Sequence, residues 1–520
     1  MRVLLVYPSY PVTYWGAEHT RQFTKKRGFL PPLGLITVAA LLPQHWELRL
    51  CDMNLGPLED AQLDWADAVF VTGMLVQREG LHEVARRARQ HGAMVVAGGP
   101  YATARPDLVQ PDVDCVVVGE AEDLMDTLAA ALEQGPAALP RRLEAPARPA
   151  MARSPLPRYD LLDLDAYLTL GVQFSRGCPF HCEFCDIIEL FGRVPRLKSV
   201  AQLLGELDAV YALGFRGSIF LVDDNFIGNK TEVRRLLAPL TAWMQAHDYP
   251  FDFFTEASVN LAEDVPLIDA MVEAGFSMVF LGIETPSEEA LRAAHKLQNV
   301  RRPLDEAVTI IVQRGLEVQA GFIVGFDSDD RDTVERQRAW IARSPIPLAM
   351  TGVLMALPGT QLERRLAAEG RLCQESSGDN FMGTNFRTRI DELDLLEGYE
   401  RLLADIYAPA AYFERVARAL ALCPTEHLRF RRPPLYAWGC GLRSLWYQGV
   451  RGTYRGAYWR FLGRVLRDTP GRFTRAVGLA IHGHHMIRYT AEDVLPRLRT
   501  AIAALRARRA AAAAEARAAA

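Results

Sequence analysis

The densest group of reactive side chains in this sequence is a run of three cysteines. Cys178, Cys182 and Cys185 lie within eight residues, in the spacing C-x3-C-x2-C. Thiolates are ligands for soft metals, and three that lie this close together can hold three irons of a [4Fe–4S] cluster. The fourth iron would then have no protein ligand and would be open to another molecule.

A zinc site is the alternative interpretation of this loop. His181 would be the fourth ligand, but its neighbour Cys182 makes simultaneous ligation awkward, and the usual paired C-x2-C…C-x2-C layout is absent. Eight cysteines are few for 520 residues. In a reducing compartment they indicate metal chemistry rather than disulfides. The spacing therefore favours the iron–sulfur cluster.

Six strand–helix units position this loop. A helical pattern that ends in Gly, followed at once by an apolar strand, repeats as ALGFRGSIFLVDD, EAGFSMVFLGIET and QRGLEVQAGFIVG. Consecutive units of this kind cross over right-handed and curl into a barrel. We therefore expect a partial (β/α)6 barrel over residues 158–370, with the cysteines directly after its first strand.

The rest of the chain divides into a sheet domain, a linker and a helical domain, so the fold class is α/β. Residues 1–133 alternate helical patterns with five strands that are apolar at nearly every position, which indicates a doubly wound parallel sheet. A linker rich in Pro, Ala and Arg is expected at 134–157. The pattern is helical over 371–502, and the Ala/Arg-rich tail, 503–520, is expected to be a frayed helix or disordered.

Composition and apolar runs indicate the class of protein and its cellular compartment. Hydrophobic residues make up 49% and charged residues 23%, as in ordinary globular proteins, and the net charge of −4 gives no sign of a nucleic-acid partner. The first apolar run ends at Pro8 and is too short for a signal peptide. The longest run, 33–42, is about half of what a bilayer crossing requires. We expect a cytoplasmic protein.

The cysteine loop, placed ahead of these units, resembles the radical S-adenosylmethionine (SAM) superfamily over residues 165–370. In that superfamily the open iron binds the amino and carboxylate groups of SAM, and reductive cleavage yields a 5′-deoxyadenosyl radical. The resemblance implies that Cys178, Cys182 and Cys185 are the cluster ligands.

The same resemblance implies a set of SAM-binding residues at the ends of the barrel strands. Phe184 matches an aromatic position near the adenine, Glu256 a ribose-contacting position, and Glu284 a polar position in the pocket. Core packing is the alternative for Phe184, and pairing with an arginine is the alternative for the two acids. Turn and helix-cap chemistry, or tight packing, would equally explain the others. The whole expected set is Phe184, Asp223, Asp224, Asn225, Glu256, Glu284, Gly321 and Gly325.

The N-terminal sheet resembles the cobalamin-binding domain of a large class of radical SAM enzymes. The motif Asp-x-His-x-x-Gly, which supplies an axial histidine to cobalt in other cobalamin proteins, is absent, and residues 51–54 read Cys-Asp-Met-Asn. Without that ligand the cobalt would be easier to reduce. A flavodoxin-like sheet with another role is the alternative. The expected cobalamin-binding residues are Met74, Leu75, Gln77, Gly98, Gly99, Pro100, Gly119 and Glu120.

The C-terminal region is similar to a helical domain found in a subgroup that includes the hopanoid C-2 methylases. Residues 427–475 hold eleven arginines and one acid, Asp468, with aromatic residues between them. That composition fits peripheral docking on an anionic membrane, but we favour the alternative, a helical cap with aromatic residues in its core and solvated arginines. His484 and His485 are interpreted as a structural pair.

Together these features predict a cobalamin-dependent radical SAM enzyme. The resemblance implies a C-methyltransferase that acts on an unactivated carbon of a small-molecule or lipid substrate, through a 5′-deoxyadenosyl radical and methylcobalamin. Two alternatives remain: a radical cyclisation, rearrangement or oxidation without methyl transfer, and a cobalamin or Fe–S sensor. The expected partners are the substrate and an electron donor such as flavodoxin or ferredoxin.

Overall fold

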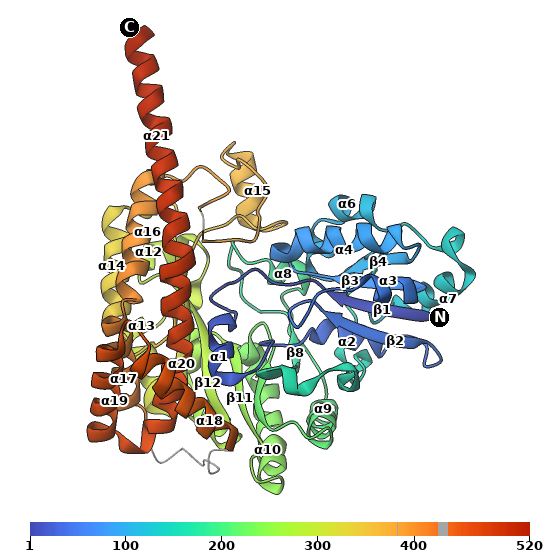
Figure 1. Cartoon of the computed structure of the whole chain (residues 1–520), viewed down its shortest axis with the longest axis horizontal. Helices are drawn as coiled ribbons and strands as arrows, with labels where there is room; N and C mark the ends of the chain where they lie inside the picture. The colour runs from blue at the N-terminus through green and yellow to red at the C-terminus, as the bar shows by residue number, and fades with distance from the viewer. Residues whose placement is uncertain (382, 425–434, 520) are drawn as a thin grey trace. The chain divides into compact units, whose positions relative to one another are not determined.

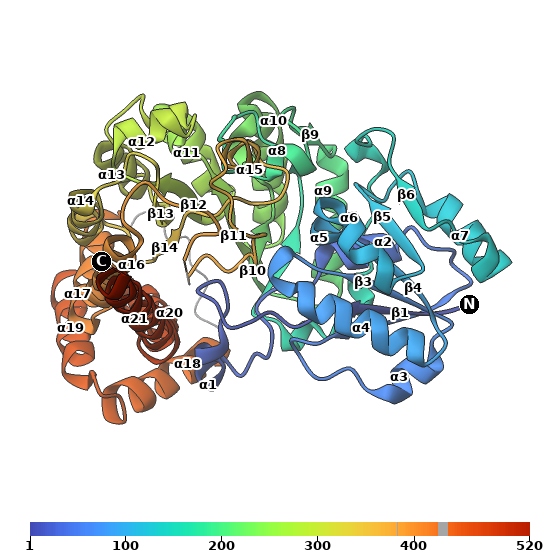
Figure 2. The same cartoon turned by 90° about the horizontal axis from the view of Figure 1, so that it is seen from above.

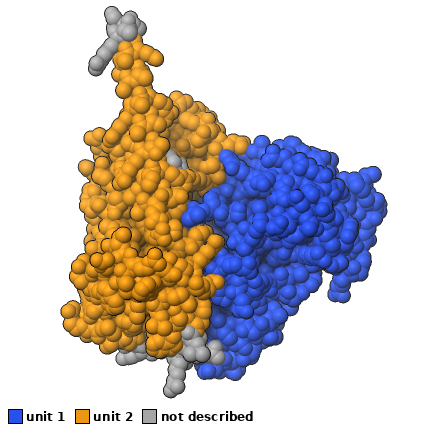
Figure 3. All heavy atoms as spheres, viewed as in Figure 1, with its two compact units in different colours: residues 1–13, 26–180, 185–256 blue, residues 14–25, 181–184, 257–520 orange. Residues whose placement is uncertain are grey.

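The computed structural model describes residues 1–381, 383–424 and 435–519. The chain separates into two compact units that interleave along the sequence (Figure 3). Unit 1 comprises residues 1–13, 26–180 and 185–256, and unit 2 comprises residues 14–25, 181–184 and 257–520.

A six-stranded parallel sheet forms the N-terminal part of unit 1. Its strands are β1 (Arg2–Tyr7), β2 (Glu47–Asp52), β3 (Ala68–Thr72), β4 (Met94–Gly98), β5 (Cys115–Val118) and β6 (Arg142–Glu144), in the order β2-β1-β3-β4-β5-β6. In the register of β1, Val3 lies opposite Leu48 on one side and Ala68 on the other. The edge strand β6 falls in the segment expected to be a linker. Arg142 and Glu144 are exposed there, so the strand has no apolar run that a sequence reading could recognise.

Helices cover both faces of this sheet, as the continuous apolar strands require. One face packs against α3 (Asp60–Trp65), α4 (Arg78–Gln90), α5 (Pro100–Ala104) and α6 (Pro106–Val109). The other packs against α2 (Leu33–Ala39) and α7 (Met125–Gln134). Figure 2 shows these helices around the strands. The predicted doubly wound sheet is confirmed.

A second sheet of six parallel strands follows, in the order β14-β13-β12-β11-β10-β7. Its strands are β7 (Thr169–Val172), β10 (Gly217–Leu221), β11 (Phe251–Ala257), β12 (Phe276–Glu284), β13 (Glu317–Val324) and β14 (Ala349–Val353). The helices between and after them are α9 (Val200–Ala212), α10 (Lys230–Ala246), α11 (Val265–Glu273), α12 (Glu288–Ala293), α13 (Leu304–Gln313), α14 (Arg331–Arg343) and α15 (Gln361–Ala368). The predicted partial barrel is therefore confirmed.

Left-handed glycines end the helices that precede three of these strands. Gly214, Gly275 and Gly315 have φ values of 88°, 101° and 107°, the conformation that closes a helix and turns the chain back to the sheet. A short antiparallel pair, β8 (Ser175–Arg176) and β9 (Arg196–Leu197), flanks the cysteine loop together with α8 (Ile187–Leu190).

Helices make up the C-terminal part of unit 2. They are α16 (Glu392–Ile406), α17 (Pro409–Leu422), α18 (Leu435–Ser444), α19 (Arg455–Asp468), α20 (Phe473–Tyr489) and α21 (Leu495–Ala519), with π-helical turns at Leu445–Val450 and Thr490–Val494. The N-terminal segment 14–25, which contains α1 (Arg21–Thr24), packs among them, and the buried Tyr14 hydroxyl lies 2.6 Å from that of Thr490.

The tail is part of the helix α21. This helix runs beside α16 and extends past it (Figure 1). Arg506 and Arg509 of α21 pair with Glu397 and Asp391 at the start of α16, each at 2.7 Å. No helix of the described residues is both long enough and apolar enough to cross a bilayer.

Candidate active site

The cysteine loop lies between β8 and α8, and its three thiols are free. Cys182 is buried, while Cys178 and Cys185 are half-buried. Within the described residues no three such side chains already converge as a metal site. The donor set, three unpaired thiols on one short loop, nevertheless fits an iron–sulfur cluster that is open at one iron.

His181 is occupied by other contacts, which argues against the zinc alternative. Its Nε2 lies 2.8 Å from the amide nitrogen of Gln361, and its ring stacks on that of His295 with centroids 6.0 Å apart. A zinc site would require this ring to leave both partners.

Three consecutive polar residues after β10 hold the backbone that leads into the loop. Asp223 accepts hydrogen bonds from the Phe174 amide (2.8 Å) and the Ser175 hydroxyl (2.5 Å). Asp224 accepts one from the amide of Gly177 at 2.7 Å. Burial raises the pKa of Asp223 to about 7 and that of Asp224 to about 6.

Asn225 reaches the sulfur itself, with its Nδ2 3.8 Å from Sγ of Cys178. Hydrogen bonds to cluster sulfurs are one of the means by which a protein sets the reduction potential. The three residues expected to bind SAM are thus also the supports of the cysteine loop.

Glu120, expected at the cobalamin, is buried at the end of β5 and pairs with two arginines. It accepts hydrogen bonds from Arg176 at 2.7 Å and from Arg196 at 2.6 Å. Arg176 also lies 2.7 Å from Glu122 and comes two residues before Cys178. These ion pairs connect the N-terminal sheet to the loop. Sequence reasoning missed both arginines, since single arginines outside a periodic pattern carry no signal.

Glycine turns expose backbone at the carboxyl ends of β4 and β5, where parallel sheets bind ligands. Gly99 has φ 90°, and a Cβ there would lie 2.1 Å from Oγ1 of Thr72. Gly119 has φ 87°, and its amide donates to Oγ1 of Thr103 at 3.0 Å. Gly98 ends β4 and Pro100 begins α5. The glycines leave the backbone at these two strand ends without side chains, which fits the close approach of a large cofactor.

The loop after β3 contains one exposed residue and two that are engaged in packing. Met74 is 49% exposed, whereas Leu75 packs against the sheet core. The buried Gln77 accepts from the Met74 amide at 2.9 Å and donates to the carbonyl of Pro8 at 2.6 Å. Gln77 therefore holds the loop in shape, and Met74 is the residue that it presents.

Hydrogen bonds fix the segment at the end of β2, residues 52–54, which contains no histidine. One carboxylate oxygen of Asp52 accepts from the backbone and side-chain nitrogens of Asn54, at 2.9 and 2.7 Å, and the other accepts from the Tyr167 hydroxyl at 2.7 Å. Asn54 in turn accepts from the Tyr10 amide at 2.8 Å. The residues present fit a corrin that has no protein base.

Phe184 packs within an apolar cluster of unit 2 and is also close to a cation. Its ring meets that of Phe326 edge-on at 6.1 Å, and the ammonium of Lys296 lies 5.8 Å from its centroid. Lys296 pairs with Glu284, and both are buried. The partner of Glu284 is thus a lysine, which sequence reasoning missed.

Glu284 has a strained backbone at the end of β12. Its φ is 65°, directly after a register shift at Gly282. A Cβ on Gly282 would lie 2.5 Å from both the Glu284 carboxylate and the Lys296 ammonium. The Asn299 amide supports the bulge by donating to the carbonyls of Gly282 and Ile283. Strain of this kind in a residue other than glycine is concentrated at functional sites.

The remaining expected residues lie within or just after neighbouring strands. Gly321 is within β13, where a Cβ would be 3.3 Å from the ring of Phe280. Gly325 follows that strand with φ 100°, and its amide donates to Asp329 at 2.8 Å. Burial raises the pKa of Asp329 to about 6. Glu256 is half-buried near the end of β11.

A second residue contacts a cysteine sulfur of the loop and was also missed. Gln298 is buried in a 3-10 turn, Leu297–Asn299, with its Nε2 3.7 Å from Sγ of Cys182. Nothing in the run HKLQN distinguishes this glutamine from a surface residue.

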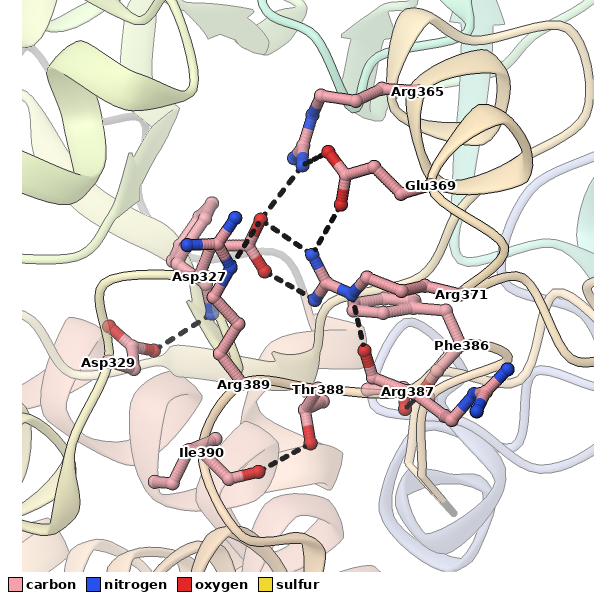
Figure 4. A network of polar contacts seen from close by, with 12 residues as sticks. Asp327, Asp329, Arg365, Glu369, Arg371, Phe386, Arg387, Thr388, Arg389 and Ile390 are labelled. Atoms are coloured by element: carbon pink, nitrogen blue, oxygen red, sulfur yellow. Dashed lines mark hydrogen bonds and ion pairs between the residues drawn. The ribbon is translucent and has the colours of Figure 1, made fainter.

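Glu183, between two of the cysteines, is held by a network of charges. Arg365 of α15 donates to it through Nη2 and Nε, at 2.9 and 3.1 Å. Arg365 also donates to Asp327 at 2.8 Å, and Asp327 accepts from Arg371 as well (Figure 4). Burial alone would raise the pKa of Asp327, but Arg371 and Arg365 hold this pKa below its usual value.

Comparison with known families assigns each part of this architecture. Residues 23–129 match a B12 binding domain, residues 172–340 match the Radical SAM superfamily, and residues 360–495 match DUF4070, a domain of unknown function. The radical S-adenosylmethionine methyltransferase TsrM from Kitasatospora setae, solved with cobalamin and a [4Fe-4S] cluster bound, has a similar fold. The TM-score is 0.57 at 17% identity, over 89% of this chain and 99% of that one.

Two relatives match nearly the whole chain. An uncharacterized methyltransferase from Synechocystis is 43% identical over 94% of this chain and 92% of its own. The hopanoid C-2 methylase of Rhodopseudomonas palustris is 36% identical over 94% of each chain. The chain therefore belongs to the cobalamin-dependent radical SAM methyltransferases, enzymes whose cofactors are a [4Fe–4S] cluster, SAM and cobalamin.

Proposed function

We propose that this enzyme adds a methyl group to an unactivated carbon of a hopanoid-type lipid. The observation that carries the proposal is the 36% identity to a hopanoid C-2 methylase, which extends over 94% of both chains. That span includes the helical region after the barrel, residues 360–495, as well as the two cofactor domains. A shared reaction type alone would not require similarity in this third region.

In this proposal the chain's own residues hold and orient the cofactors. We assign Cys178, Cys182 and Cys185 to the cluster, with Asn225 and Gln298 as donors to its sulfurs. When bound, the cluster and SAM supply a radical that removes hydrogen from the substrate, and cobalamin supplies the methyl group.

Two further groups orient the ligands. The strained Glu284, paired with Lys296 beside the Phe184 ring, would recognise a polar group of SAM, and its buried partner fixes the direction of the carboxylate. The glycine turns at Gly99 and Gly119 would let the backbone come close to the corrin. We also propose a one-electron donor such as flavodoxin or ferredoxin as the partner that reduces the cluster.

The test is an anaerobic reaction with the reconstituted enzyme, a reductant, a hopanoid and SAM that carries a deuterated methyl group. We expect a product whose mass has increased by one trideuterated methyl group in place of a hydrogen, together with 5′-deoxyadenosine. Cys182→Ala should form neither product, whereas Cys373→Ala, which removes an exposed thiol, should form both.

Two outcomes would contradict the proposal. A product that forms with 5′-deoxyadenosine but without an added carbon would mean a cyclisation or oxidation on the same scaffold. Full 5′-deoxyadenosine production by Cys182→Ala would remove the ligand assignment.

A further inference from the structure

An apolar ridge lies on the surface of α18 and the π-helical turn that continues it. Trp438, Leu442, Trp446 and Val450 recur every four residues and are 65%, 67%, 54% and 50% exposed. Residues four apart lie on the same side of a helix, so these side chains form one continuous stripe. Single exposed apolar residues are ordinary, but four large ones in a row are not.

Trp459 of α19 broadens this stripe. Its indole nitrogen donates to the carbonyl of Gly449 at 2.8 Å, and its ring covers that glycine so closely that a Cβ there would lie 2.9 Å from it. Trp459 is nevertheless 48% exposed. We use the term apolar ridge for the five residues Trp438, Leu442, Trp446, Val450 and Trp459.

Arginines without counterions border the ridge. Arg451, Arg455 and Arg460 are exposed, and within the described part of the chain none of the three side chains forms an ion pair or a hydrogen bond. Arginines farther along α19 differ, because Arg464 pairs with Glu414 and Arg467 pairs with Asp468. The ridge therefore combines apolar side chains with positive charge that no acidic side chain among the described residues neutralises.

We propose that the apolar ridge and its three unpaired arginines form a docking surface for a bilayer that contains anionic lipids. Tryptophan is favoured at the boundary between headgroups and acyl chains, and arginine at the level of the phosphates. An amphipathic element of this kind lies in the plane of the interface and does not span it. An acidic protein would satisfy the arginines but gives no reason for three exposed tryptophans in one stripe.

This surface accounts for part of the Arg- and aromatic-rich stretch, and the structure divides that stretch in two. Tyr458 and Phe461 are buried in the helical core, as a cap would require. The ridge residues point away from that core. Residues 427–434 lie outside the described residues, so the surface begins in α18.

The experiment measures sedimentation of the full-length protein with vesicles of phosphatidylcholine alone and of phosphatidylcholine mixed with phosphatidylglycerol. We expect binding to the anionic vesicles and little binding to the neutral ones. The change Arg451→Gln, Arg455→Gln and Arg460→Gln should weaken binding on the order of 100-fold, since each basic residue near such a surface contributes about fivefold. The change Trp438→Ser with Trp446→Ser should weaken it at least as strongly.

A control changes two other large apolar residues that are also exposed. Leu108 and Leu213 are 43% and 45% exposed in unit 1, and Leu108→Ser with Leu213→Ser should bind like the unchanged protein. No binding to anionic vesicles at low salt would overturn the proposal. Binding that the tryptophan variant retains in full would also overturn it, because the arginines alone would then act as a general polyanion site.

Discussion

Replacing Arg365 by methionine would leave a carboxylate on the cysteine loop without its cation. Glu183 follows Cys182 directly, its side chain is 11% exposed, and Arg365 binds both of its oxygens. Arg365 is itself 34% exposed and is shared with Asp327. The substitution thus removes the two hydrogen bonds through which Arg365, on α15, holds the cysteine loop.

The structure bounds the size of this effect. Breaking a fully buried ion pair by removing one partner costs about 3–5 kcal/mol, because the remaining charge is uncompensated. Since Arg365 is about one-third exposed, water can reach part of the pair, and we expect the free energy of unfolding to fall by about 2–3 kcal/mol. Arg365→Lys keeps the charge but loses the two-pronged geometry, so about half of that loss is expected.

A double-mutant cycle isolates the pair. Glu183→Gln combined with Arg365→Met should cost about 1–2 kcal/mol less than the sum of the single changes, because the double variant leaves no unpaired charge. Urea denaturation gives the unfolding free energies, and iron per chain after reconstitution reports whether the loop still holds its cluster. We expect less iron in Arg365→Met and partial recovery in the double variant.

Arg338→Met is the matched control for this cycle. Arg338 is also about one-third exposed, at 32%, and also binds two acids, Glu335 and Asp405, but it lies on the outer helix α14. Its loss should cost under about 1 kcal/mol and leave the iron content unchanged. Additive effects of Glu183→Gln and Arg365→Met, or equal iron in all variants, would refute the positioning role of this pair.

Three further predictions concern other parts of the chain. Gly99→Ala should destabilise the N-terminal sheet by roughly 3 kcal/mol, from backbone strain and the clash with Thr72, and should abolish corrin binding; an unchanged melting temperature would contradict it. Burial and nearby cations lower the pKa of His484 to about 3, against about 6.5 when unfolded. Between those pH values the unfolded chain binds one proton that the folded chain does not. The free energy of unfolding should therefore fall by ~1.4 kcal/mol per pH unit as the pH drops below 6.5. This slope should be absent in His484→Gln. Reconstituted cobalamin should show the absorption spectrum of cobalt without a protein base, since residues 51–54 contain no histidine; a histidine-ligated spectrum would disprove it.

The fold was largely predictable because apolar periodicity reports burial directly. Strands apolar at every position predicted the doubly wound sheet, and the helix–Gly–strand repeat predicted the six-stranded barrel. The exception is β6, whose outer residues are exposed on an edge strand. A short edge strand of this kind forms because the backbone groups of β5 need hydrogen-bond partners. This is an effect of tertiary structure, and it leaves no periodic signal in the sequence.

Sequence reasoning could propose site residues where spacing along the chain expresses the chemistry, as in the cysteine motif. Where side chains converge from distant segments it could not. Lys296 and Gln298 reach Glu284 and Cys182 from a short 3-10 turn, and Arg365 reaches Glu183 across 182 positions. Single polar residues of this kind look like surface residues until the fold places them against a buried partner.

Position at a strand end selected the expected site residues, but it did not separate binding from support. Asp223 and Gln77 are both buried, and the side-chain oxygens of both accept hydrogen bonds from backbone amides of loops. A buried polar group must be satisfied from within the protein, so its partners are fixed before any ligand binds. A ligand group must instead keep donors, acceptors or bare backbone facing outward, as Gly99 and the exposed Met74 do. In the site that we propose, burial thus separates these roles: Asp223 and Gln77 shape the loops, while Gly99 and Met74 are left to meet the cofactors.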